Sequence, residues 1–380
     1  MSSNFLKALG KIEKKHKDAV RDPATAGIIE RITLPSPNLN FLFGGGQPRG
    51  RIIRFHGPES GGKTTLATYL ASIVQKQEEQ NIVIFLDFER TFDIDHARDL
   101  GMDVTDVRQG GKFLFLRPEN GEEGFTIAEE LVRTREAGLV IIDSDTTMPT
   151  SAMIESEYGK ANFGGSSKLM SEALRKFNIL LEKYNTSMII ISQERANMSL
   201  YGADFKVAGG FAQRFYSSHT NRVTKIEFIK EKGVITGIMM KVKNHKSKIG
   251  MPFREVILKL DFKKGFDVDD EYLEFMEPLG LVERRGAYYR SEKYGFNCQG
   301  KTQLLEWLKD NPAEYQVMKD EINKLIAQEN QLDADVKDPT LEPPLEEQFG
   351  EIIEDPESKT EEDQEFMDLG ARYEAVSYTH

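Results

Sequence analysis

The sequence predicts an α/β protein with a mostly parallel central sheet, an N-terminal helix and a small C-terminal α/β domain. Two observations favour this class. Across residues 36–267, short apolar runs rich in Ile and Val alternate with helical stretches, as expected for strands buried on both faces and for the helices that connect them. A glycine-rich phosphate-binding motif directly follows the first of these runs.

Residues 1–35 are predicted to hold a short helix and a linker. A basic amphipathic helix at about 4–17 would place Phe5, Leu9 and Ile12 on one face. Because such a helix is too short to be stable alone in water, we expect it to dock on its own domain, on a neighbouring subunit or on a partner.

Residues 36–267 form the predicted core. The expected parallel strands are the runs 51–55, 82–86, 139–142 and 187–191. The expected helices are 62–78, 123–137 and 166–184. Three antiparallel edge strands are expected at 225–229, 237–242 and 254–260.

Residues 268–330 are predicted to form a small satellite domain. A helical stretch at 271–279 is followed by a hairpin signal at 286–289. Residues 302–328 are typical of two helices, and Pro312 separates them.

The charge of the chain is distributed unevenly. The 380 residues include 50 Lys and Arg and 62 Asp and Glu, a net charge of −12, which at face value disfavours nucleic-acid binding. Residues 331–380 alone carry −13, from 16 acidic and three basic side chains, so the remaining 330 residues carry +1. The near-neutral body can therefore hold local basic surfaces, and the acidic segment, poor in core residues, is expected to be disordered.

Several classes are excluded or disfavoured. The single cysteine, Cys298, cannot form an intrachain disulfide, and one Cys with six His argues against a cysteine-based zinc site. No run of 18 apolar residues could span a membrane, and the first 17 residues lack the apolar core of a signal peptide. We therefore expect a cytoplasmic protein.

The most informative segment is the glycine-rich motif. Its members are Gly57, Pro58, Glu59, Ser60, Gly61, Gly62, Lys63, Thr64 and Thr65. They fit the spacing G-x-x-x-x-G-K-[ST] between a predicted strand and a predicted helix. Glycines let backbone N–H groups surround phosphates beside a helix N-terminus. Lys63 would contact the β- and γ-phosphates, and the Thr64 hydroxyl would bind Mg²⁺.

Polar residues that follow other predicted strands should meet at the same sheet edge. Asp143 is the candidate carboxylate for Mg²⁺, acting through its water shell. Glu89 is the best candidate for the general base that orients the attacking water, and Asp87 is its competitor. The amide of Gln193 is placed to sense a γ-phosphate and to relay its presence to the following loop.

These residues resemble the RecA recombinase family. The segments that carry the resemblance are 8–14, 57–65, 85–89 with 95–101, 171–176, Gly209 and Gly210 with 215–216, and 307–312. They run in one order from about residue 5 to 330, so a shared phosphate loop alone does not explain them. The resemblance implies a RecA-like DNA-dependent ATPase that polymerises on single-stranded DNA as a helical filament and catalyses homologous pairing and strand exchange.

The resemblance also implies roles at the nucleotide site. Glu89 would be the catalytic base and Gln193 the γ-phosphate sensor, with ATP and Mg²⁺ as cofactors. Asp93 and His96 fall where the family contacts adenine.

In the family, ATP lies between adjacent subunits, and two lysines reach across from the neighbour. Lys243 is the candidate for one of them. The second is Lys246 or Lys248, a choice that the sequence leaves open.

The resemblance implies two DNA-binding loops, at about 155–165 and 195–210. The candidate DNA contacts are Lys160, Phe163, Lys168, Arg175, Arg195, Tyr201, Phe205, Lys206, Gly209 and Gly210. A cation combined with an aromatic ring suits backbone tracking and base stacking.

The resemblance implies single- and double-stranded DNA and further copies of the chain as partners. A single-strand-binding protein and loading mediators are further expected partners. Whether the chain is chromosomal and nucleoid-associated, or virus-encoded and acting in a host cytoplasm, stays open. So do two alternative functions: a ring-forming helicase or motor on the same core, and a nucleotide-gated recombination regulator without strand exchange.

Overall fold

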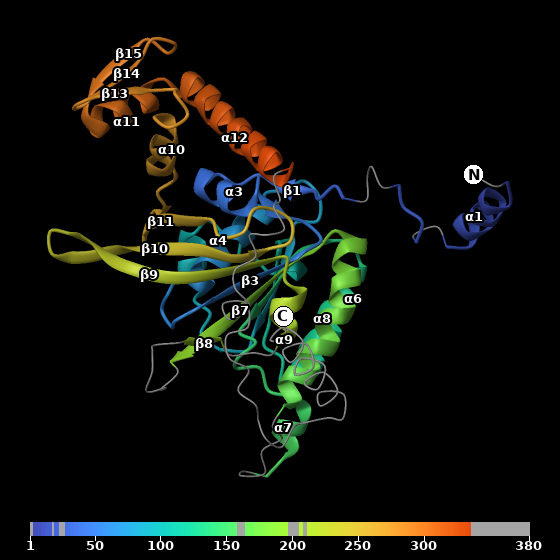
Figure 1. Ribbon diagram of the computed structural model, residues 1–380. Coiled ribbons are helices and arrows are strands. Elements are labelled where there is room, and N and C mark those ends of the chain that lie inside the picture. Colours follow the sequence, from blue (N-terminus) through green and yellow to red (C-terminus); the bar gives the residue numbers. More distant parts are fainter. Residues whose placement is uncertain are drawn as a thin grey trace, which may run out of the picture. The chain divides into compact units, whose positions relative to one another are not determined.

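The computed structural model describes residues 3–16, 19–22, 27–157, 164–196, 205–207 and 211–335 (Figure 1). These residues belong to one compact unit that ends at Asp335. The acidic segment from residue 336 onward lies outside them, so its expected disorder stays a prediction.

A large mixed sheet forms the centre of this unit. Its strands, in spatial order, are β12 (Gly265–Phe266), β11 (Glu255–Asp261), β10 (Val234–Ser247), β9 (His219–Glu231), β3 (Ile52–Gly57), β7 (Ser187–Ala196), β6 (Ala137–Asp143), β4 (Ile82–Asp87) and β5 (Phe113–Leu116). The strands from β9 to β5 pair in parallel, whereas β10, β11 and β12 extend the sheet in antiparallel. The predicted α/β class and mostly parallel sheet are therefore confirmed.

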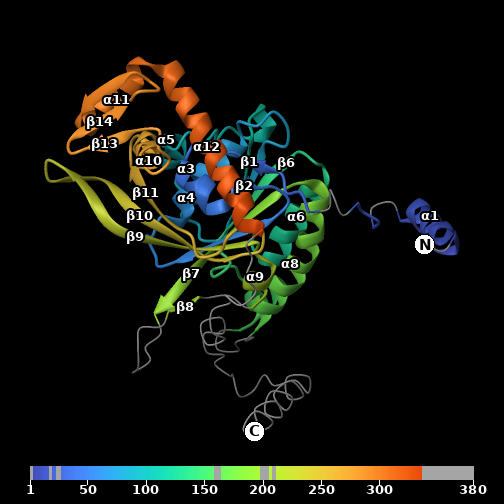
Figure 2. The same ribbon diagram turned by 45° about the horizontal axis from the view of Figure 1, so that its top comes forward.

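The central strands are buried on both faces, because a layer of helices packs on each face of the sheet. On one face, α4 (Lys63–Val74) contributes Leu66 and Leu70 to an apolar cluster that also contains Phe55 and Phe85. The other face is covered by α6 (Gly121–Arg133), α8 (Gly165–Tyr184) and α9 (Phe211–Tyr216), which lie together in Figure 2. Alternate residues of each strand thus serve opposite cores.

The antiparallel part of the sheet differs in length from the prediction. The edge strands expected at 225–229 and 237–242 belong to the longer β9 and β10, whose hairpin extends past the neighbouring strands (Figures 1 and 2). Beyond the predicted set, β8 (Phe205–Val207) pairs in antiparallel with β7, so that Arg195 lies opposite Lys206. The described ends of the segment 195–210 therefore form a two-stranded ladder.

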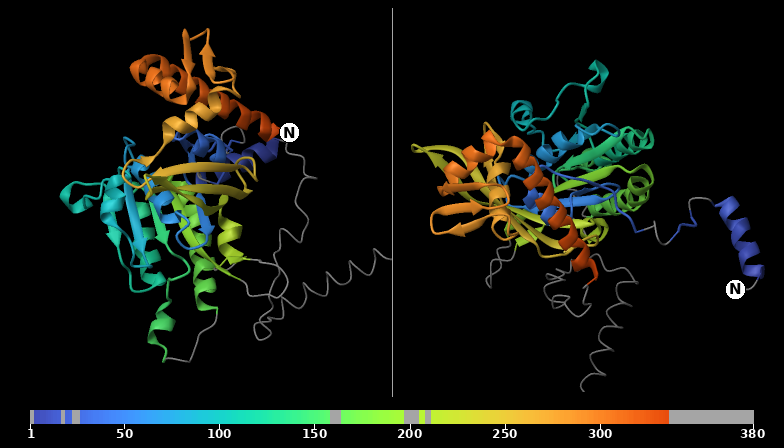
Figure 3. Two further views of the ribbon diagram at one scale, coloured as in Figure 1. Left: turned by 90° about the vertical axis from the view of Figure 1, so that its left-hand side faces the viewer. Right: turned by 90° about the horizontal axis from the view of Figure 1, so that it is seen from above.

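The elements after β12, drawn in orange and red in Figure 3, enclose their own apolar cluster. They are α10 (Val268–Met276), β13 (Glu283–Arg285), β14 (Tyr288–Ser291), β15 (Phe296–Gln299), α11 (Gly300–Asp310) and α12 (Pro312–Asp335). The expected hairpin is part of a three-stranded sheet. Helix α12 begins at Pro312, which suits a first helical turn, and continues past the expected boundary at residue 330.

The N-terminal helix forms as α1 (Ser3–Lys15). Its apolar side chains Phe5, Leu6 and Ile12 are all exposed, so the described part of this single chain does not cover them. The linker holds β1 (Arg31–Ile32), which pairs in antiparallel with β2 (Gln47–Pro48), and α3 (Pro37–Phe43) lies between these two strands in the sequence. None of the described helices combines the length and apolar character needed to cross a membrane.

Candidate nucleotide site

The phosphate loop is shaped by its close approach to β9. Gly57 has a φ of 150°, and a Cβ at this position would lie 2.1 Å from the carbonyl oxygen of Val223. A Cβ on Gly61 would lie 2.9 Å from the same oxygen. Gly62 adopts a φ of 93° as the N-cap of α4. The glycines of the motif are therefore required by backbone geometry.

Lys63 lies over the loop that it follows. Its Nζ donates hydrogen bonds to the carbonyl oxygens of Gly57, at 3.1 Å, and of Pro58, at 2.7 Å. Burial lowers the pKa of Lys63, while nearby carboxylates, Asp143 first among them, oppose that effect. The ammonium group is thus held beside the loop that would receive phosphates.

Thr64 and Asp143 meet at the carboxyl edge of the sheet. The Thr64 hydroxyl donates a 2.7 Å hydrogen bond to Oδ2 of Asp143. The other oxygen, Oδ1, is buried and accepts no hydrogen bond from the described residues. Burial, with the charges of Glu89 and Asp87, raises the pKa of Asp143 to about 7. A hydroxyl beside an unsatisfied carboxylate oxygen suits a divalent cation of the Mg²⁺ type.

Glu89 and Gln193 are in direct contact. Nε2 of Gln193 donates a 2.9 Å hydrogen bond to Oε1 of Glu89. The backbone N–H of Glu89 donates to the carbonyl of Asp143 at 3.0 Å, which fixes Glu89 beside the end of β6. Gln193 pairs in register with Gly57, the first residue of the phosphate loop. The carboxylate and the amide therefore lie next to the expected γ-phosphate position.

Asp87, the competitor of Glu89, is engaged elsewhere. Its Oδ1 accepts the backbone N–H of Arg90 at 2.7 Å, and its Oδ2 accepts Nε of Arg117 at 2.9 Å. Its side chain is only 1% exposed. These contacts assign Asp87 to holding the turn after β4, and they favour Glu89 as the base.

The two predicted adenine contacts sit at the start of α5 (Ile94–Asp99). Asp93 caps this helix by accepting the backbone N–H groups of Asp95 and His96, each at 3.0 Å. Nε2 of His96 lies 3.4 Å from the hydroxyl oxygen of Thr65. The structure therefore brings His96 to the first turn of α4, beside the phosphate loop.

Of the three candidate interface lysines, Lys243 and Lys246 lie near the end of β10, and Lys248 directly follows it. Lys243 is exposed. Lys246 donates to the carbonyl of Arg214 at 2.7 Å, and Lys248 donates to the carbonyl of Phe215. Burial, with the charges of Lys248 and Arg214, lowers the pKa of Lys246 to about 8. Both lysines are thus anchored on α9 within one chain.

The predicted DNA contacts are only partly described. Those outside the described residues are Lys160, Phe163, Tyr201, Gly209 and Gly210. Arg195, Phe205 and Lys206 lie on the β7–β8 ladder. Lys168 and Arg175 are both exposed on α8, where a spacing of seven residues places them on one helix face.

One cluster beside the phosphate loop was not predicted. His56 Nδ1 lies 2.8 Å from Oε1 of Glu194, and Arg222 donates to both oxygens of that carboxylate, at 3.0 and 2.9 Å. Burial favours the neutral acid, but the hydrogen bonds from His56 and Arg222 hold the pKa of Glu194 at about 2. The only signal in the sequence was His56 itself, a polar residue inside a buried strand.

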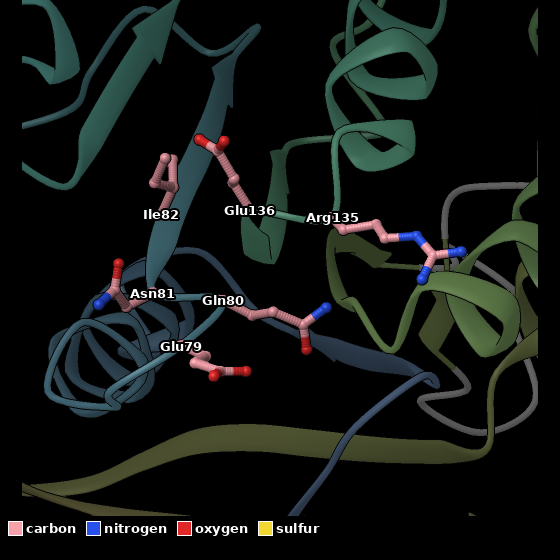
Figure 4. Close-up of a pocket in the computed structure, with 6 residues that line it drawn as sticks. All are labelled: Glu79, Gln80, Asn81, Ile82, Arg135 and Glu136. Carbon is pink, nitrogen blue, oxygen red and sulfur yellow. The ribbon is translucent and has the colours of Figure 1, made fainter.

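A hollow of about 320 Å³ lies at the opposite edge of the sheet (Figure 4). Its lining residues are Glu79, Gln80, Asn81, Ile82, Arg135 and Glu136. Gln80 is already bonded to Arg49 and to the carbonyl of Tyr184. Because β4 and β6 begin here, the hollow lies away from the edge where parallel sheets bind ligands.

A glycine-rich strand–helix loop next to a hydroxyl–carboxylate pair, at the carboxyl edge of a parallel sheet, defines this protein as a P-loop ATPase. The matches with known proteins narrow the class. A family model for the RecA N-terminal domain matches residues 4–267. The chain belongs to the RecA family.

Relatives that match over most of their own length agree with the family model. Protein RecA of Mesoplasma florum is 32% identical over 283 residues, which cover 74% of this chain and 82% of the relative. Protein RecA of Syntrophus aciditrophicus is 36% identical over 271 residues, or 70% and 76% of the two chains. Protein RecA of Chlorobium chlorochromatii is 33% identical over 307 residues, or 80% and 84%. The chain is thus a DNA-dependent ATPase of the P-loop type and an ATP-dependent recombinase.

Proposed function

We propose that Glu89 and Gln193 form the hydrolytic and sensing pair of this recombinase, at an ATP site that a neighbouring copy in the filament completes. The observation that carries the proposal is the 2.9 Å hydrogen bond from Gln193 to Glu89 at the sheet edge that holds the phosphate loop. This bond occupies one oxygen of the carboxylate.

The bond supports a simple exchange. When a γ-phosphate enters, the Gln193 amide turns to donate to it, and Oε1 of Glu89 is released. The freed carboxylate then accepts a proton from the attacking water, while the ammonium group of Lys63 leaves the carbonyls of the loop for the phosphate oxygens. Hydrolysis is thereby tied to the presence of ATP.

Asp143 and Thr64 would hold Mg²⁺ through the unsatisfied Oδ1 and the hydroxyl. When bound, the cation neutralises charge that develops on the phosphates. His96 and Asp93 support an adenine position beside α5, since His96 lies next to Thr65.

The second half of the site comes from another copy. Lys243, with Lys246 or Lys248, would approach the phosphates of the adjacent subunit, and α1 would place its exposed apolar side chains on that neighbour. The segments 155–165 and 195–210 would bind single-stranded and then duplex DNA, supported by exposed Lys168 and Arg175 on α8. A single-strand-binding protein and loading mediators are the expected further partners, in the cytoplasm.

The two alternatives are not favoured. A ring-forming motor or a regulator without strand exchange would share the phosphate loop, but relatives named RecA match 70–80% of this chain. The match with the family also covers every strand of the central sheet, together with α1 from residue 4 onward.

The test combines three measurements on the full chain. Single-stranded DNA should stimulate ATP hydrolysis, electron microscopy should show helical filaments with a non-hydrolysable ATP analogue, and homologous strands should be exchanged. Lys63→Ala should abolish all three, whereas Glu79→Gln, at the opposite sheet edge, should change none. Intact hydrolysis in Lys63→Ala would overturn the site assignment.

A further inference from the structure

A buried cluster of polar side chains lies beneath the nucleotide edge of the sheet. Neighbouring residues on β7 point to opposite faces of the sheet, so the side chains of Ser192 and Gln193 lie on different faces. Gln193 contacts Glu89, whereas the Ser192 hydroxyl accepts a 2.9 Å hydrogen bond from Nε of Arg54 on β3. Ser192 is fully buried and Arg54 is 4% exposed. The charged Arg54 side chain is therefore held on the face of the sheet that α6, α8 and α9 cover.

Asp145 is the centre of this cluster. Its Oδ2 accepts hydrogen bonds from the Ser192 hydroxyl, at 2.9 Å, and from Nε2 of Gln213 on α9, at 3.1 Å. Its Oδ1 accepts the Thr146 hydroxyl at 3.1 Å. Asp145 and Gln213 are 5% and 1% exposed. A carboxylate this deeply buried is costly unless its hydrogen bonds and its charge partner are kept, so the cluster holds its elements together.

Thr146 joins the cluster to the sensing residue. Its hydroxyl oxygen accepts the backbone N–H of Gln193 at 3.0 Å and donates to Asp145. The backbone N–H of Asp145 also donates to the carbonyl of Ile191 at 3.0 Å. Only two hydrogen bonds therefore separate Asp145 from the residue whose amide contacts Glu89.

The same carboxylate bonds the described segments on both sides of the second predicted DNA loop, and it lies close in sequence to the segment before the first. Strand β7 enters the segment 195–210, and α9, which carries Gln213, begins at Phe211 directly after it. Asp145 itself lies six residues before α7 (Ser151–Glu155), which leads into the segment 155–165. The Asp145 side chain thus bonds the elements at both ends of the second loop, and the residue lies shortly before the first loop in the sequence.

We propose that Asp145, with Thr146 and Gln213, couples the Glu89–Gln193 pair to both DNA loops. When Gln193 turns to a γ-phosphate, the movement of its backbone is passed through Thr146 to Asp145, and from there to α9. ATP then strengthens DNA binding, and DNA stimulates hydrolysis, only while these hydrogen bonds are intact. The three are positioning residues, because they act through others. The inference rests on the proposed assignment of the two loops to DNA.

The test removes single hydrogen bonds at nearly constant volume. Gln213→Met deletes the donor on α9, and Thr146→Val deletes the hydroxyl bridge. In the full chain, one measures the affinity for single-stranded DNA with and without a non-hydrolysable ATP analogue, and the analogue's affinity with and without DNA. The two ratios must agree, since coupling between binding sites is reciprocal. We expect each variant to lower this coupling factor about fivefold or more. In Gln213→Met, nucleotide affinity and hydrolysis without DNA should be unchanged.

Gln75→Met is the matched control. Gln75 is 4% exposed and lies on the face of the sheet that α4 covers. Its Nε2 donates to the carbonyl of Asp103 at 2.8 Å. This variant should lose stability as Gln213→Met does, measured by thermal unfolding, yet keep the wild-type coupling factor.

The outcomes separate the inference from the proposed function. A wild-type coupling factor in both Gln213→Met and Thr146→Val would overturn the inference alone. So would an equal loss of coupling in Gln75→Met, because the effect would then follow stability. A wild-type chain in which ATP and DNA do not affect each other's binding would overturn the proposed function as well.

Discussion

Nε2 of Gln193 donates its hydrogen bond to Oε1 of Glu89 across a gap of 2.9 Å, so the proposed sensing amide and the proposed catalytic carboxylate are in direct contact. Glu89→Gln keeps the shape and an acceptor for this bond but removes the base. Single-stranded-DNA-stimulated phosphate release should fall by about 10²–10⁴-fold. Binding of a fluorescent ATP analogue should stay near wild type. A nearly unchanged rate of phosphate release would show that a residue other than Glu89 is the general base.

The interface lysines can be tested by mixing inactive chains. If Lys248 acts across the subunit boundary, Lys248→Ala and Glu89→Gln chains should each lack DNA-stimulated hydrolysis. A one-to-one mixture should regain activity at about one boundary in four, where an intact Glu89 meets an intact Lys248.

The same mixture with Lys246→Ala shows which of the two lysines has this role. Both are anchored on α9, through the carbonyls of Arg214 and Phe215, so either variant also frees the end of that helix. A mixture that regains no DNA-stimulated hydrolysis would show that the lysine acts on the nucleotide site of its own chain.

A buried carboxyl group links α10 to the core. The Ser36 hydroxyl, at the N-cap of α3, donates to Oε2 of Glu271, and Oε1 is buried and accepts no hydrogen bond from the described residues. Burial, with weaker contributions from Glu274 and Asp267, raises the pKa of Glu271 to about 8 from an ordinary 4.5. The folded protein therefore keeps a proton between these pH values that the unfolded chain loses.

This difference makes stability fall as pH rises through that window. Between pH 5.5 and pH 8, the wild type should lose roughly 3 kcal/mol more free energy of unfolding than Glu271→Gln. Urea unfolding at the two pH values measures it. Glu274→Gln, at an exposed neighbour on the same helix, should follow the wild type. If the free energy of unfolding changed equally with pH in Glu271→Gln and in the wild type, Glu271 would ionise normally in the folded protein.

The acidic segment should restrain DNA binding. Residues 336–380 hold 14 acidic and three basic side chains, and a polyanionic segment competes with DNA for the same cationic surfaces. Truncation after Asp335, where α12 ends, should tighten binding of duplex DNA at low salt and reduce its sensitivity to Mg²⁺. A chain of full length with these carboxylates changed to amides should behave like the truncation. Unchanged binding in both would contradict a competing role.

The sequence predicted the parts of this molecule that depend on local pattern. Runs of Ile and Val marked the central strands, and the spacing around Lys63 marked the phosphate loop. Strand β13 was not predicted, because its three residues, Glu283 to Arg285, are all charged and exposed and show no apolar alternation. The edge strand β5 was not predicted either, because it is only four residues long.

The polar clusters could not be predicted, because they depend on register between distant strands. Arg54, Asp145, Ser192 and Gln213 are spread over 160 residues, and nothing local signals that they meet. Likewise, the contacts of Asp87 with Arg90 and Arg117, which favour Glu89 as the base, depend on residues that no local pattern brings together.

The carbonyl oxygen of Val223 stands against two glycines of the phosphate loop, Gly57 and Gly61. Selection on these positions therefore acts through the packing of β9 and would continue in a descendant that had lost its nucleotide. Among diverging copies of such a gene, Gly57 should outlast Lys63 and Thr64, whose side chains are free to change once phosphate is no longer bound. The loss of that lysine and threonine, with the glycines retained, would be the expected mark of a decayed ATPase on this fold.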